Sequence, residues 1–347
     1  ALQTALPQRK KWFIRRMKNM KQILVTGATG FLGSRTVERL SEMPELSVRA
    51  TGRKLNKNNE VKADNVHYML GDLNDSDFVA QLVDGVDCIV HAAALSSPWG
   101  SKDDFWQSNV NPTKLLLEAA ARQDVKRFVF LSTPSMYFEM KALSGLKEAD
   151  SLPRPINQYA ASKREAERLI KAANVPYVIL RPRALIGRGD TVILPRILRA
   201  HKESRLRQMG IGNNKVDVTP VVNVVDAIVL GMEAQGKALN EVYNISNGEP
   251  VALWPMLHGL LAKLSLPPLT KSIPLPLILT VARLMEWHAR WFNGNQEPTL
   301  TVYGVGTLAM DFSMDISKAQ NLLGYTPRQS VEEALDDFIE WHLQTSP

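Results

Sequence analysis

The stretch VTGATGFLGSRTVERL, Val25 to Leu40, carries three glycines at intervals of three residues: Gly27, Gly30 and Gly33. An apolar run precedes it and the periodic residues of SRTVERLSEM overlap its end, which together predict a strand, a tight turn and a helix. Glycine lets the chain turn sharply and approach a pyrophosphate, while a helix N-terminus offers free N–H groups and a positive dipole. The stretch therefore predicts a phosphate-binding loop for a dinucleotide; a tight turn without a ligand is the alternative.

The first half of the chain repeats this alternation of strand and helix. Apolar runs predict strands within QILVTG, SVRATGR, NVHYMLGDL, VDCIVHAAA, VKRFVFLST and PYVILRP. Helices are predicted at SRTVERLSEM, DSDFVAQLV and DDFWQSNVNPTKLLLEAAARQ, and a further helix carries Tyr159. Such alternation is typical of a parallel sheet covered on both faces. The predicted fold class is α/β, a Rossmann-type doubly wound parallel sheet with a smaller C-terminal substrate-binding domain.

The periodicity weakens after Arg181, where arginine and proline become frequent. PVVNVVDAIVLGMEA then has the pattern of a strand entering a helix, EVYNISNG that of another strand, and both are predicted to return to the sheet. We therefore predict a dinucleotide-binding domain at residues 21–182 plus 221–247 and a substrate domain at residues 183–220 plus 248–347. Residues 1–20 are predicted to form a basic, disordered leader.

The bulk composition excludes several classes of protein. With 347 residues, 45% of them hydrophobic, the chain is long enough to bury a substantial core. The single cysteine, Cys88, lies in an apolar run typical of a buried strand. This excludes a disulfide framework and agrees with a reducing, cytoplasmic location. We predict no metal site.

The net charge of +7 belongs to the N-terminal segment RKKWFIRRMKNMK. Seven basic residues lie at or before Lys21, no acidic residue precedes Glu38, and the rest of the chain has 35 basic and 35 acidic residues. A neutral body gives no reason to expect a nucleic-acid partner. The basic segment could be an interfacial membrane anchor, but a disordered leader or residues ahead of a true start at Met20 are favoured.

No apolar run reaches membrane-spanning length. The nearest is PLPLILTVARLMEWHARWF, Pro274 to Phe292, which is interrupted by Arg283, Glu286 and Arg290. Its charges and aromatic residues suit an amphipathic helix that acts as a lid or a surface anchor, although packing in the core is the more common role of such a helix.

The end of the second strand bears on which dinucleotide is bound. An NAD site commonly has an acidic residue there, which bonds the ribose 2′-hydroxyl. Here the sequence is ATGRKLNKN, with Arg53 and Lys54 and no acid. Arginine can bind a 2′-phosphate through two hydrogen bonds, so NADP(H) is favoured over NAD(H); a solvated basic turn is the alternative.

A tyrosine and a lysine four residues apart, Tyr159 and Lys163, lie in the helical stretch NQYAASKREAERL. Residues i and i+4 share a helix face, where an ammonium near a phenol favours the phenolate and lowers its pKa. Such a phenol could exchange a proton near neutral pH. From spacing alone, two solvated residues on an exposed helix are the more common explanation.

Together these motifs resemble the short-chain dehydrogenase/reductase family in its extended form, the NAD-dependent epimerase/dehydratase group, over most of residues 21–342. The resemblance rests on the glycine loop, on GDL at residues 71–73, on HAAA from His91, on NVNPT from Asn109, on LST ending at Thr133 and on the Tyr159–Lys163 pair. The motifs come in the family's order and at suitable spacing. Pro112 departs from the pattern, since family members often have glycine there.

The resemblance implies a role for each matched residue. Tyr159 would be the acid/base, and Lys163 would lower its pKa and bond the nicotinamide ribose. Thr133 would hydrogen-bond the substrate oxygen, with Ser132 as the competing choice and a backbone-bonded strand-end hydroxyl as the alternative role. Asp72 would contact adenine unless it is only a cap or turn residue, and Asn109 would support the site. The implied cofactor-binding residues are Gly27, Thr29, Gly30, Phe31, Leu32, Gly33, Arg53, Asp72, Leu73, Ala92, Ala93, Ala94, Asn109, Tyr159 and Lys163.

Within the family, the chain is most similar to the 3β-hydroxysteroid dehydrogenase-like branch, and there to the bacterial 2-alkyl-3-oxoalkanoate reductases of olefin biosynthesis. The similarity rests on HAAALSSPWGSKDDFWQSNV, LSTPSMYF, LRPRALIGRGDTVILPRI and YNISNGEPV. It implies NADPH-dependent reduction of a 2-alkyl-3-oxo acid, an apolar and acidic substrate, to the 3-hydroxy acid. Among seven arginines between residues 181 and 207, Arg183 and Arg188 are candidates for a substrate carboxylate; a nucleotide-sugar diphosphate or plain surface are alternatives.

Other functions remain open for the same residues. A sterol dehydrogenase or a nucleotide-sugar epimerase/dehydratase would use the same fold, and an NADP-sensing regulator would bind the cofactor without catalysis. Such regulators typically lose the tyrosine–lysine pair, which this chain retains. Family members often dimerise through two helices, here near residues 104–122 and 157–172, so a homodimer is expected. Contact with a membrane surface or a biosynthetic complex could also occur.

Overall fold

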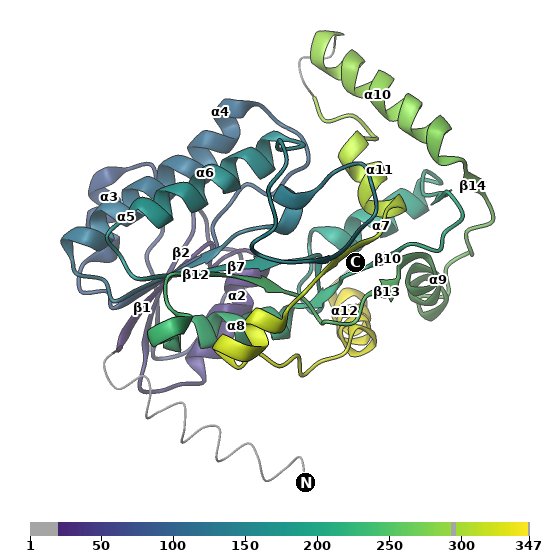
Figure 1. Cartoon of the computed structure of the whole chain (residues 1–347). Helices are drawn as coiled ribbons and strands as arrows, with labels where there is room; N and C mark the ends of the chain where they lie inside the picture. Colours follow the sequence, from purple (N-terminus) through teal and green to yellow (C-terminus); the bar gives the residue numbers. More distant parts are fainter. Residues whose placement is uncertain (1–19, 293–295, 346–347) are drawn as a thin grey trace.

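The computed structural model describes residues 20–292 and 296–345, and its centre is a parallel sheet of seven strands (Figure 1). The strands lie in the order β12-β7-β5-β4-β1-β2-β3, and every neighbouring pair is parallel. They are β1 (Gln22–Thr26), β2 (Ser47–Thr51), β3 (Val66–Tyr68), β4 (Cys88–His91), β5 (Arg127–Leu131), β7 (Tyr177–Pro182) and β12 (Glu241–Ile245). The predicted α/β fold is confirmed. The predicted leader lies outside the described residues, apart from Met20, which packs against the core.

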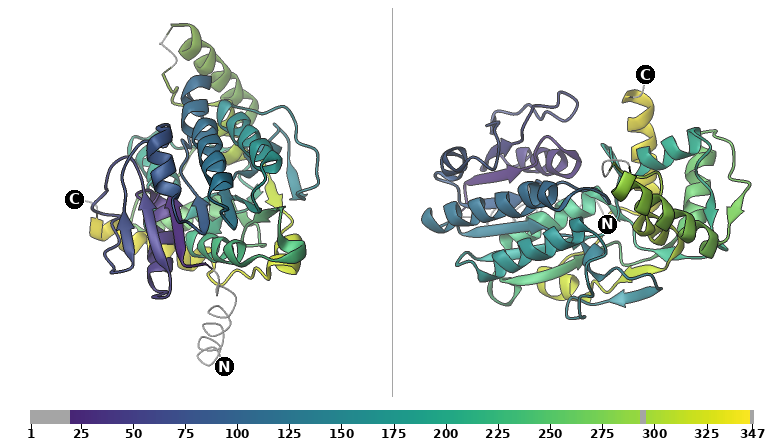
Figure 2. Two further views of the ribbon diagram at one scale, coloured as in Figure 1. Left: turned by 90° about the vertical axis from the view of Figure 1, so that its left-hand side faces the viewer. Right: turned by 90° about the horizontal axis from the view of Figure 1, so that it is seen from above.

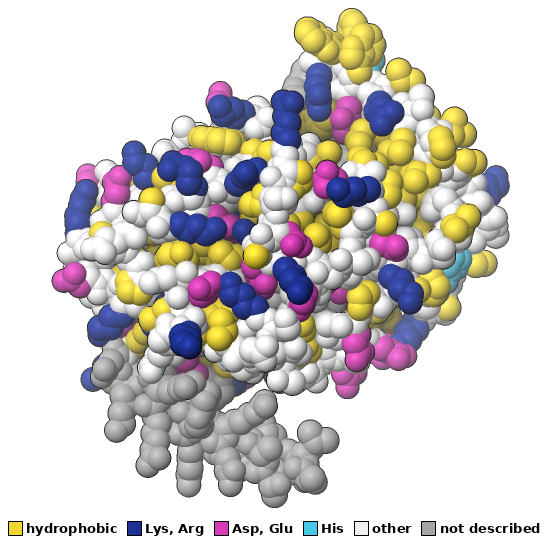
Figure 3. All heavy atoms as spheres, viewed as in Figure 1, with side chains coloured by type: hydrophobic (Ala, Val, Ile, Leu, Met, Phe, Trp, Pro, Cys, Tyr) yellow, Lys and Arg dark blue, Asp and Glu magenta, His cyan; other side chains and the backbone are white. Residues whose placement is uncertain are grey.

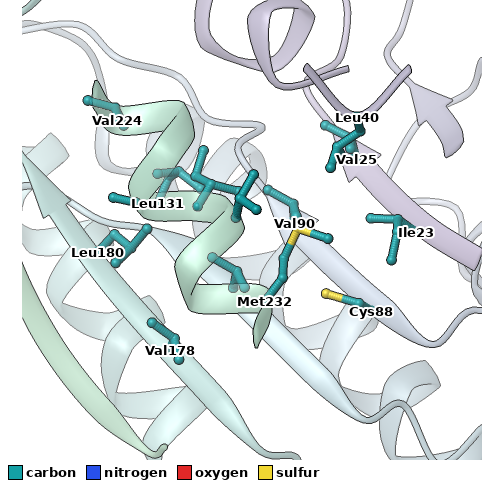
Figure 4. Close-up of a cluster of buried hydrophobic side chains, with 14 of the residues drawn as sticks. Ile23, Val25, Leu40, Cys88, Val90, Leu131, Val178, Leu180, Val224 and Met232 are labelled. Atoms are coloured by element: carbon teal, nitrogen blue, oxygen red, sulfur yellow. The ribbon is translucent and has the colours of Figure 1, made fainter. Parts of the chain in front are cut away.

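Helices cover both faces of this sheet (Figures 1 and 2). One face carries α2 (Phe31–Ser41) and α8 (Val221–Glu233), and the other carries α3 (Ser76–Val83), α5 (Asn111–Arg122) and α6 (Gln158–Ala172). Successive side chains of a strand point to opposite faces, so Ile23 and Val25 of β1 join the first core and Leu24 joins the second. Figure 4 shows the first core, where Cys88 is fully buried and burial raises the pKa of its thiol to about 12.

The stretch PVVNVVDAIVLGMEA differs from its predicted form. Its valines, with Ile228 and Met232, recur at helical spacing, and the helix α8 begins at Val221. Only two residues before it, β11 (Thr219–Pro220), are in a strand, and they pair with β8 (Leu185–Ile186) rather than with the large sheet. The prediction that a strand of this stretch returns to the large sheet is therefore wrong, whereas β12 does return to it.

A smaller part of the molecule adjoins the carboxyl ends of the large sheet's strands. Its sheet has the order β13-β10-β15-β6. These strands are β6 (Leu143–Leu146), β10 (Lys215–Val216), β13 (Val251–Ala252) and β15 (Phe312–Met314). The helices here are α7 (Ile193–Lys202), α9 (Leu253–Lys263), α10 (Leu275–Phe292), α11 (Val302–Ala309) and α12 (Val331–Thr345).

The chain does not divide cleanly between the two sheets. β6 comes from between β5 and α6, yet it pairs with β15, where Phe312 lies opposite Leu143. Conversely, Ala319, Leu323 and Tyr325 come late in the chain but join the core under the large sheet. Boundaries drawn from periodicity alone would assign each of these segments to the other part. Within the described residues, no helix is both long and apolar enough to cross a membrane.

Candidate active site

The glycine loop between β1 and α2 has the close packing that its spacing predicts. Gly27 has a φ of +67°, and a Cβ atom there would lie 2.8 Å from Cα of Ala93. A Cβ atom at Gly33 would lie 2.0 Å from the carbonyl oxygen of Gly27. Gly30 is the N-cap residue of α2, which begins at Phe31 and continues through Leu32. Only glycine fits at Gly27 and Gly33, and the turn presents the helix N-terminus at the edge of the sheet.

Other predicted cofactor residues follow neighbouring strands at the same edge. Ala92, Ala93 and Ala94 come directly after β4, and Arg53 lies exposed just after β2. The carbonyl of Thr29 accepts a hydrogen bond from the buried Asn59 at 3.2 Å, which ties the basic turn to the glycine loop. Because β2, β1 and β4 are adjacent and parallel, the segments that follow them lie together at the carboxyl ends of the strands. A dinucleotide would lie along these segments.

Asp72 and Leu73 follow β3 on this edge, and the structure shows a local role for each. The carboxylate of Asp72 accepts hydrogen bonds from the backbone N–H of Asn74 at 2.9 Å and from its side chain at 3.1 Å. Leu73 is partly buried against the second core. Asp72 thus makes the turn contact that is the alternative to adenine binding, and its exposed side chain remains at the sheet edge.

A buried chain of hydrogen bonds fixes the end of β4. Thr113 donates to the carbonyl of Asn109 at 2.6 Å, so its oxygen accepts from Nε2 of His91 at 3.0 Å. Nδ1 of His91 therefore accepts from the hydroxyl of Thr26 at 2.7 Å, and Thr26 accepts from the backbone of Ala93 at 3.2 Å. Burial and the nearby Lys163 charge lower the pKa of His91 to about 3, so the ring is neutral and structural.

Asn109 ties the loop after β4 to the helix that carries Tyr159. Its amide oxygen accepts from the backbone of Leu95 at 2.7 Å, while its nitrogen donates to the Leu95 carbonyl at 3.1 Å and to Ser162 at 2.9 Å. The predicted long helix around it is interrupted, because residues 106–110 form a π turn between α4 (Lys102–Phe105) and α5. Pro112 lies two residues after this turn and cannot donate a backbone hydrogen bond, consistent with the altered helix.

Tyr159 lies in the first turn of α6, where the side chain of Asn157 caps the helix by accepting from the backbone of Ala160 at 2.9 Å. Burial raises the pKa of the Tyr159 hydroxyl, and hydrogen bonds with the side chains of Ser96 and Thr133 lower it. The net direction is upward, so the expected lowering of this pKa is not met. Burial outweighs the favourable contacts, and the phenol keeps its proton at neutral pH.

Lys163 lies one turn further along α6 and is buried. Its ammonium donates to the carbonyl oxygen of Leu131 at 2.7 Å and lies 4.5 Å from the ring centroid of Phe130. Burial lowers the pKa of Lys163 to about 7, while the charge of Glu167 raises it. The ammonium is thus directed at the end of β5.

The two hydroxyls at the end of β5 point to different surroundings. Ser132 donates to the carboxylate of Glu167 at 2.6 Å in the buried core. Thr133 instead lies close enough to Tyr159 to lower the pKa of its phenol, and it donates to Ser135 at 3.0 Å. The geometry therefore favours Thr133 over Ser132 as the hydroxyl that meets a substrate beside Tyr159.

Glu167 belongs to a buried network that joins α6 to β7. Arg181 binds it through two hydrogen bonds, of 2.8 and 2.6 Å, and also donates to the hydroxyl of Tyr137. Tyr137 in turn donates to Asn244 at 3.3 Å. Burial alone would raise the pKa of the Glu167 carboxyl, but Arg181 and Ser132 together lower it by a larger amount. The net shift is downward, so Glu167 is ionised and pairs with the charged Arg181. Arg181 is thus a structural residue.

Three site residues were not predicted from the sequence: Ser96, Ser135 and Tyr303. Tyr303, on α11, lies beside Arg183 and Ser135; burial raises the pKa of its phenol, and those two neighbours lower it. Ser96 and Ser135 lie within the motifs HAAALSSPW and LSTPSMYF, but serines in loops have no distinctive sequence pattern. Tyr303 is far along the chain from Tyr159, and only the folded structure brings the two phenols together.

The two candidate substrate arginines differ in position. The guanidinium carbon of Arg183 lies 4.3 Å from the ring centroid of Phe312, and the side chain reaches Tyr303. Its Nε is buried without a hydrogen-bond partner. Arg188 instead forms an ion pair of 2.5 Å with Glu38 of α2, and both side chains are partly exposed. The structure therefore joins Arg183, but not Arg188, to the group around Tyr159.

Comparisons with known proteins agree with this site. Residues 23–246 match the NAD dependent epimerase/dehydratase family. The protein YbjS of Escherichia coli (strain K12) is 34% identical over 92% of this chain and 97% of that protein. A 2-alkyl-3-oxoalkanoate reductase of Stenotrophomonas maltophilia (strain K279a) is 34% identical over 90% of this chain and 97% of that enzyme. The solved structure of MoeE5 in complex with UDP-glucose and NAD is similar with a TM-score of 0.73 and 25% identity, over 94% of this chain and 100% of that one.

The family match spans more than half of the chain and includes the glycine loop, Thr133, Tyr159 and Lys163. The glycine loop fits a dinucleotide because Gly27 and Gly33 allow a turn too tight for any Cβ atom, and this turn leads directly into the N-terminus of α2. The chain belongs to the NAD-dependent epimerase/dehydratase family and is an NAD(P)-dependent oxidoreductase.

Proposed function

We propose that the protein interconverts a ketone and a secondary alcohol, using NADP(H), and that it reduces a 2-alkyl-3-oxoalkanoic acid to the 3-hydroxy acid. The observation that carries the proposal is the contact between the Tyr159 phenol and the Thr133 hydroxyl, with Tyr303 and Arg183 beyond Thr133. A proton donor, a hydroxyl and an anion-binding group thus lie in one cluster. A 3-oxo acid carries a ketone and a carboxylate at similarly close positions.

The protonated Tyr159 suits the reducing direction. Burial raises its pKa, so near neutral pH the phenol can give a proton to a carbonyl oxygen that is gaining negative charge. The hydroxyl of Thr133 can stabilise the same oxygen. In the opposite direction, the phenolate would accept the proton of the alcohol.

The cofactor would be held by the glycine loop, by the segment after β4 and by Lys163, whose ammonium lies at the end of β5, one helical turn from Tyr159. When bound, the reduced nicotinamide supplies the hydride. The NADP preference is supported by Arg53, which is exposed at the end of β2 where a 2′-phosphate would lie.

Arg183 and Tyr303 are suited to the carboxylate of the substrate. A guanidinium and a phenol can both donate to carboxylate oxygens, and the buried Nε of Arg183 offers a donor that no protein atom uses. The surroundings suit the alkyl parts, because Tyr303 packs against Phe138 at a ring separation of 5.0 Å and adjoins an apolar cluster with Phe312.

A paired turnover assay tests this proposal. Purified protein receives a racemic 2-alkyl-3-hydroxyalkanoic acid with NADP⁺ and then with NAD⁺, and the absorbance of the reduced nicotinamide is followed. We expect faster reduction of NADP⁺, a loss of that preference in Arg53→Ser, and a loss of about 100-fold or more in kcat in Tyr159→Phe. Absence of turnover with both cofactors would overturn the substrate, and sterols and nucleotide sugars would be tested next.

A further inference from the structure

We propose that α10 lies on a membrane surface that contains anionic lipid and holds the mouth of the active site against it. Six large apolar side chains of this helix are exposed to between 39% and 74% of their area: Leu277, Val281, Leu284, Trp287, Trp291 and Phe292. The rest of the described chain has its exposed large apolar side chains spread singly over several elements. A concentration of this kind on one helix marks a surface that meets an apolar environment.

The apolar side chains form one stripe along the helix. Leu277, Val281, Leu284 and Trp291 recur at intervals of three, four or seven residues, which places them on a common face. A different face, with Ile278, Ala282 and Ala289, is buried against the protein. The helix projects at the rim of the molecule, and Figure 3 shows apolar side chains gathered over its outer end (Figures 1 and 3). The stripe is therefore open to a flat surface.

The charges beside the stripe favour an anionic surface. Lys271, Arg283 and Arg290 are exposed on this segment. Its one acidic residue between positions 271 and 292, Glu286, accepts a hydrogen bond from the backbone of Val302 at 2.8 Å and pairs with Arg290 at 3.4 Å, which, among the described residues, leaves Lys271 and Arg283 as the uncompensated charges of this segment. Apolar and aromatic side chains flanked by basic ones are typical of helices that lie in the membrane interface.

A shallow, open hollow lies beside the stripe. It has a volume of about 380 Å³ and is lined by Val281, Leu284, Met285, His288, Ala289, Glu297, Pro298 and Thr299. A flexible hydrocarbon chain can enter such a hollow, and the aromatic pair Trp287 and Phe292, 5.2 Å apart, would rest among the headgroups at its edge.

The helix also borders the candidate active site. Glu286 holds the start of α11, which carries Tyr303, and the guanidinium of Arg290 lies 5.2 Å from the ring centroid of Trp99 in the loop after Ser96. A membrane under α10 would place an apolar substrate beside the loop with Trp99 and the helix with Tyr303. This part of the inference rests on the proposed function.

Cosedimentation with vesicles tests the membrane contact. The full chain is mixed with vesicles of phosphatidylcholine and phosphatidylglycerol in equal parts, or of phosphatidylcholine alone. We expect binding to the anionic vesicles, at least tenfold weaker in the double variant Leu277→Glu/Trp291→Glu. The matched control is Leu343→Glu on α12, which adds a charge at another exposed leucine and should bind like the wild type.

Two outcomes would overturn the proposal. One is equal partitioning of wild type and double variant. The other is a lower mass of the double variant than of the wild type in solution without vesicles. That result would mean that the stripe binds a second copy of the chain. Turnover of a short, water-soluble 3-hydroxy acid without vesicles should be the same in all forms. A failure of that turnover with vesicle binding intact would count against the proposed substrate alone.

Discussion

The neighbouring hydroxyls of Ser132 and Thr133 show how one residue along a chain separates structure from chemistry. Ser132 directly follows β5 and points into the core, where its hydroxyl donates a hydrogen bond to the carboxylate of Glu167. Thr133 points to the other side, toward Tyr159 and Ser135. The strand alternation thus decides which hydroxyl is available to a ligand.

Substitutions at these two positions should have opposite effects. Ser132→Ala removes a hydrogen bond to a buried carboxylate, so we expect a loss of about 1.5–3 kcal/mol in the free energy of unfolding with little change in kcat. Thr133→Val should lower kcat by 10-fold or more with little loss of stability. Thr133→Ser keeps the hydroxyl and should keep kcat near the wild-type value. Urea unfolding and the nicotinamide assay measure both quantities. The assignment is wrong if Ser132→Ala loses the activity and Thr133→Val keeps it.

The buried ammonium of Lys163 should make stability depend on pH in a particular range. Its pKa is lowered to about 7 in the folded protein, so between about pH 7 and 10 the unfolded chain holds more protons than the folded one. The contribution of Lys163 to stability should therefore rise with pH across this range. We expect the free energy of unfolding of the wild type to increase relative to Lys163→Met between pH 7 and 10. Parallel pH profiles of the two proteins in urea titrations would contradict this.

The sequence predicted the site residues that occur in compact motifs, and missed those that depend on tertiary structure. Tyr159 and Lys163 are one helical turn apart, and the glycine loop is contiguous, so their spacing carries the information. Tyr303 approaches Ser135 only because α11 packs against the segment after β5 near Phe138. The direction of the Tyr159 pKa was also out of reach, because it depends on burial, which spacing does not reveal.

At the scale of elements, the ion pair between Glu167 and Arg181 joins α6, the helix that carries Tyr159, to β7. Both side chains are almost fully buried, at 3% and 2% exposure. The pair holds α6 in register with the strand end that carries Ser132 and Thr133. Its role is thus to keep Tyr159 in position relative to the sheet.

Breaking this pair should destabilise the fold. Arg181→Met leaves an ionised carboxylate buried without its main partner, and we expect a loss of about 3–5 kcal/mol in the free energy of unfolding. The double variant Arg181→Met/Glu167→Met should recover part of that loss, because no charge is then left unpaired. Arg168→Met on the same helix, which removes an exposed ion pair with Glu165, should cost less than about 1 kcal/mol. Equal effects of the two single arginine variants in urea unfolding would refute the interpretation.

The elements themselves were predicted with uneven success. The strands of the large sheet are short apolar runs of β-branched residues, and all seven were expected. The stretch from Val221 was misjudged at its start because a fully buried helix and a buried strand are both apolar throughout. The π turn at residues 106–110 could not be predicted, since its cause is a local change in hydrogen bonding within one continuous helix.

For the whole molecule, a homodimer remains a prediction. α5 and α6 lie side by side on one face of the sheet, with Lys114, Glu118, Arg164 and Arg168 exposed along them. If two copies pair through these helices, light scattering should give twice the chain mass of 38.7 kDa. The variant Leu277→Glu/Trp291→Glu, which alters a different face, should keep that mass. A value near 38.7 kDa would refute the dimer.

The passage of β6 into the smaller sheet has a consequence for protein engineering. Chimaeras between relatives are usually cut where one domain ends and the next begins, and a single cut after Pro182 would look natural here. Such a chimaera would join a native β6 to a foreign β15, because these strands are partners although they lie on opposite sides of the cut. The strand β6, which precedes α6 in the chain, would then pair with a strand that does not fit it. This would disturb the position of Tyr159 on α6. To exchange substrate specificity, a designer must transplant Leu143–Leu146 together with the C-terminal segments.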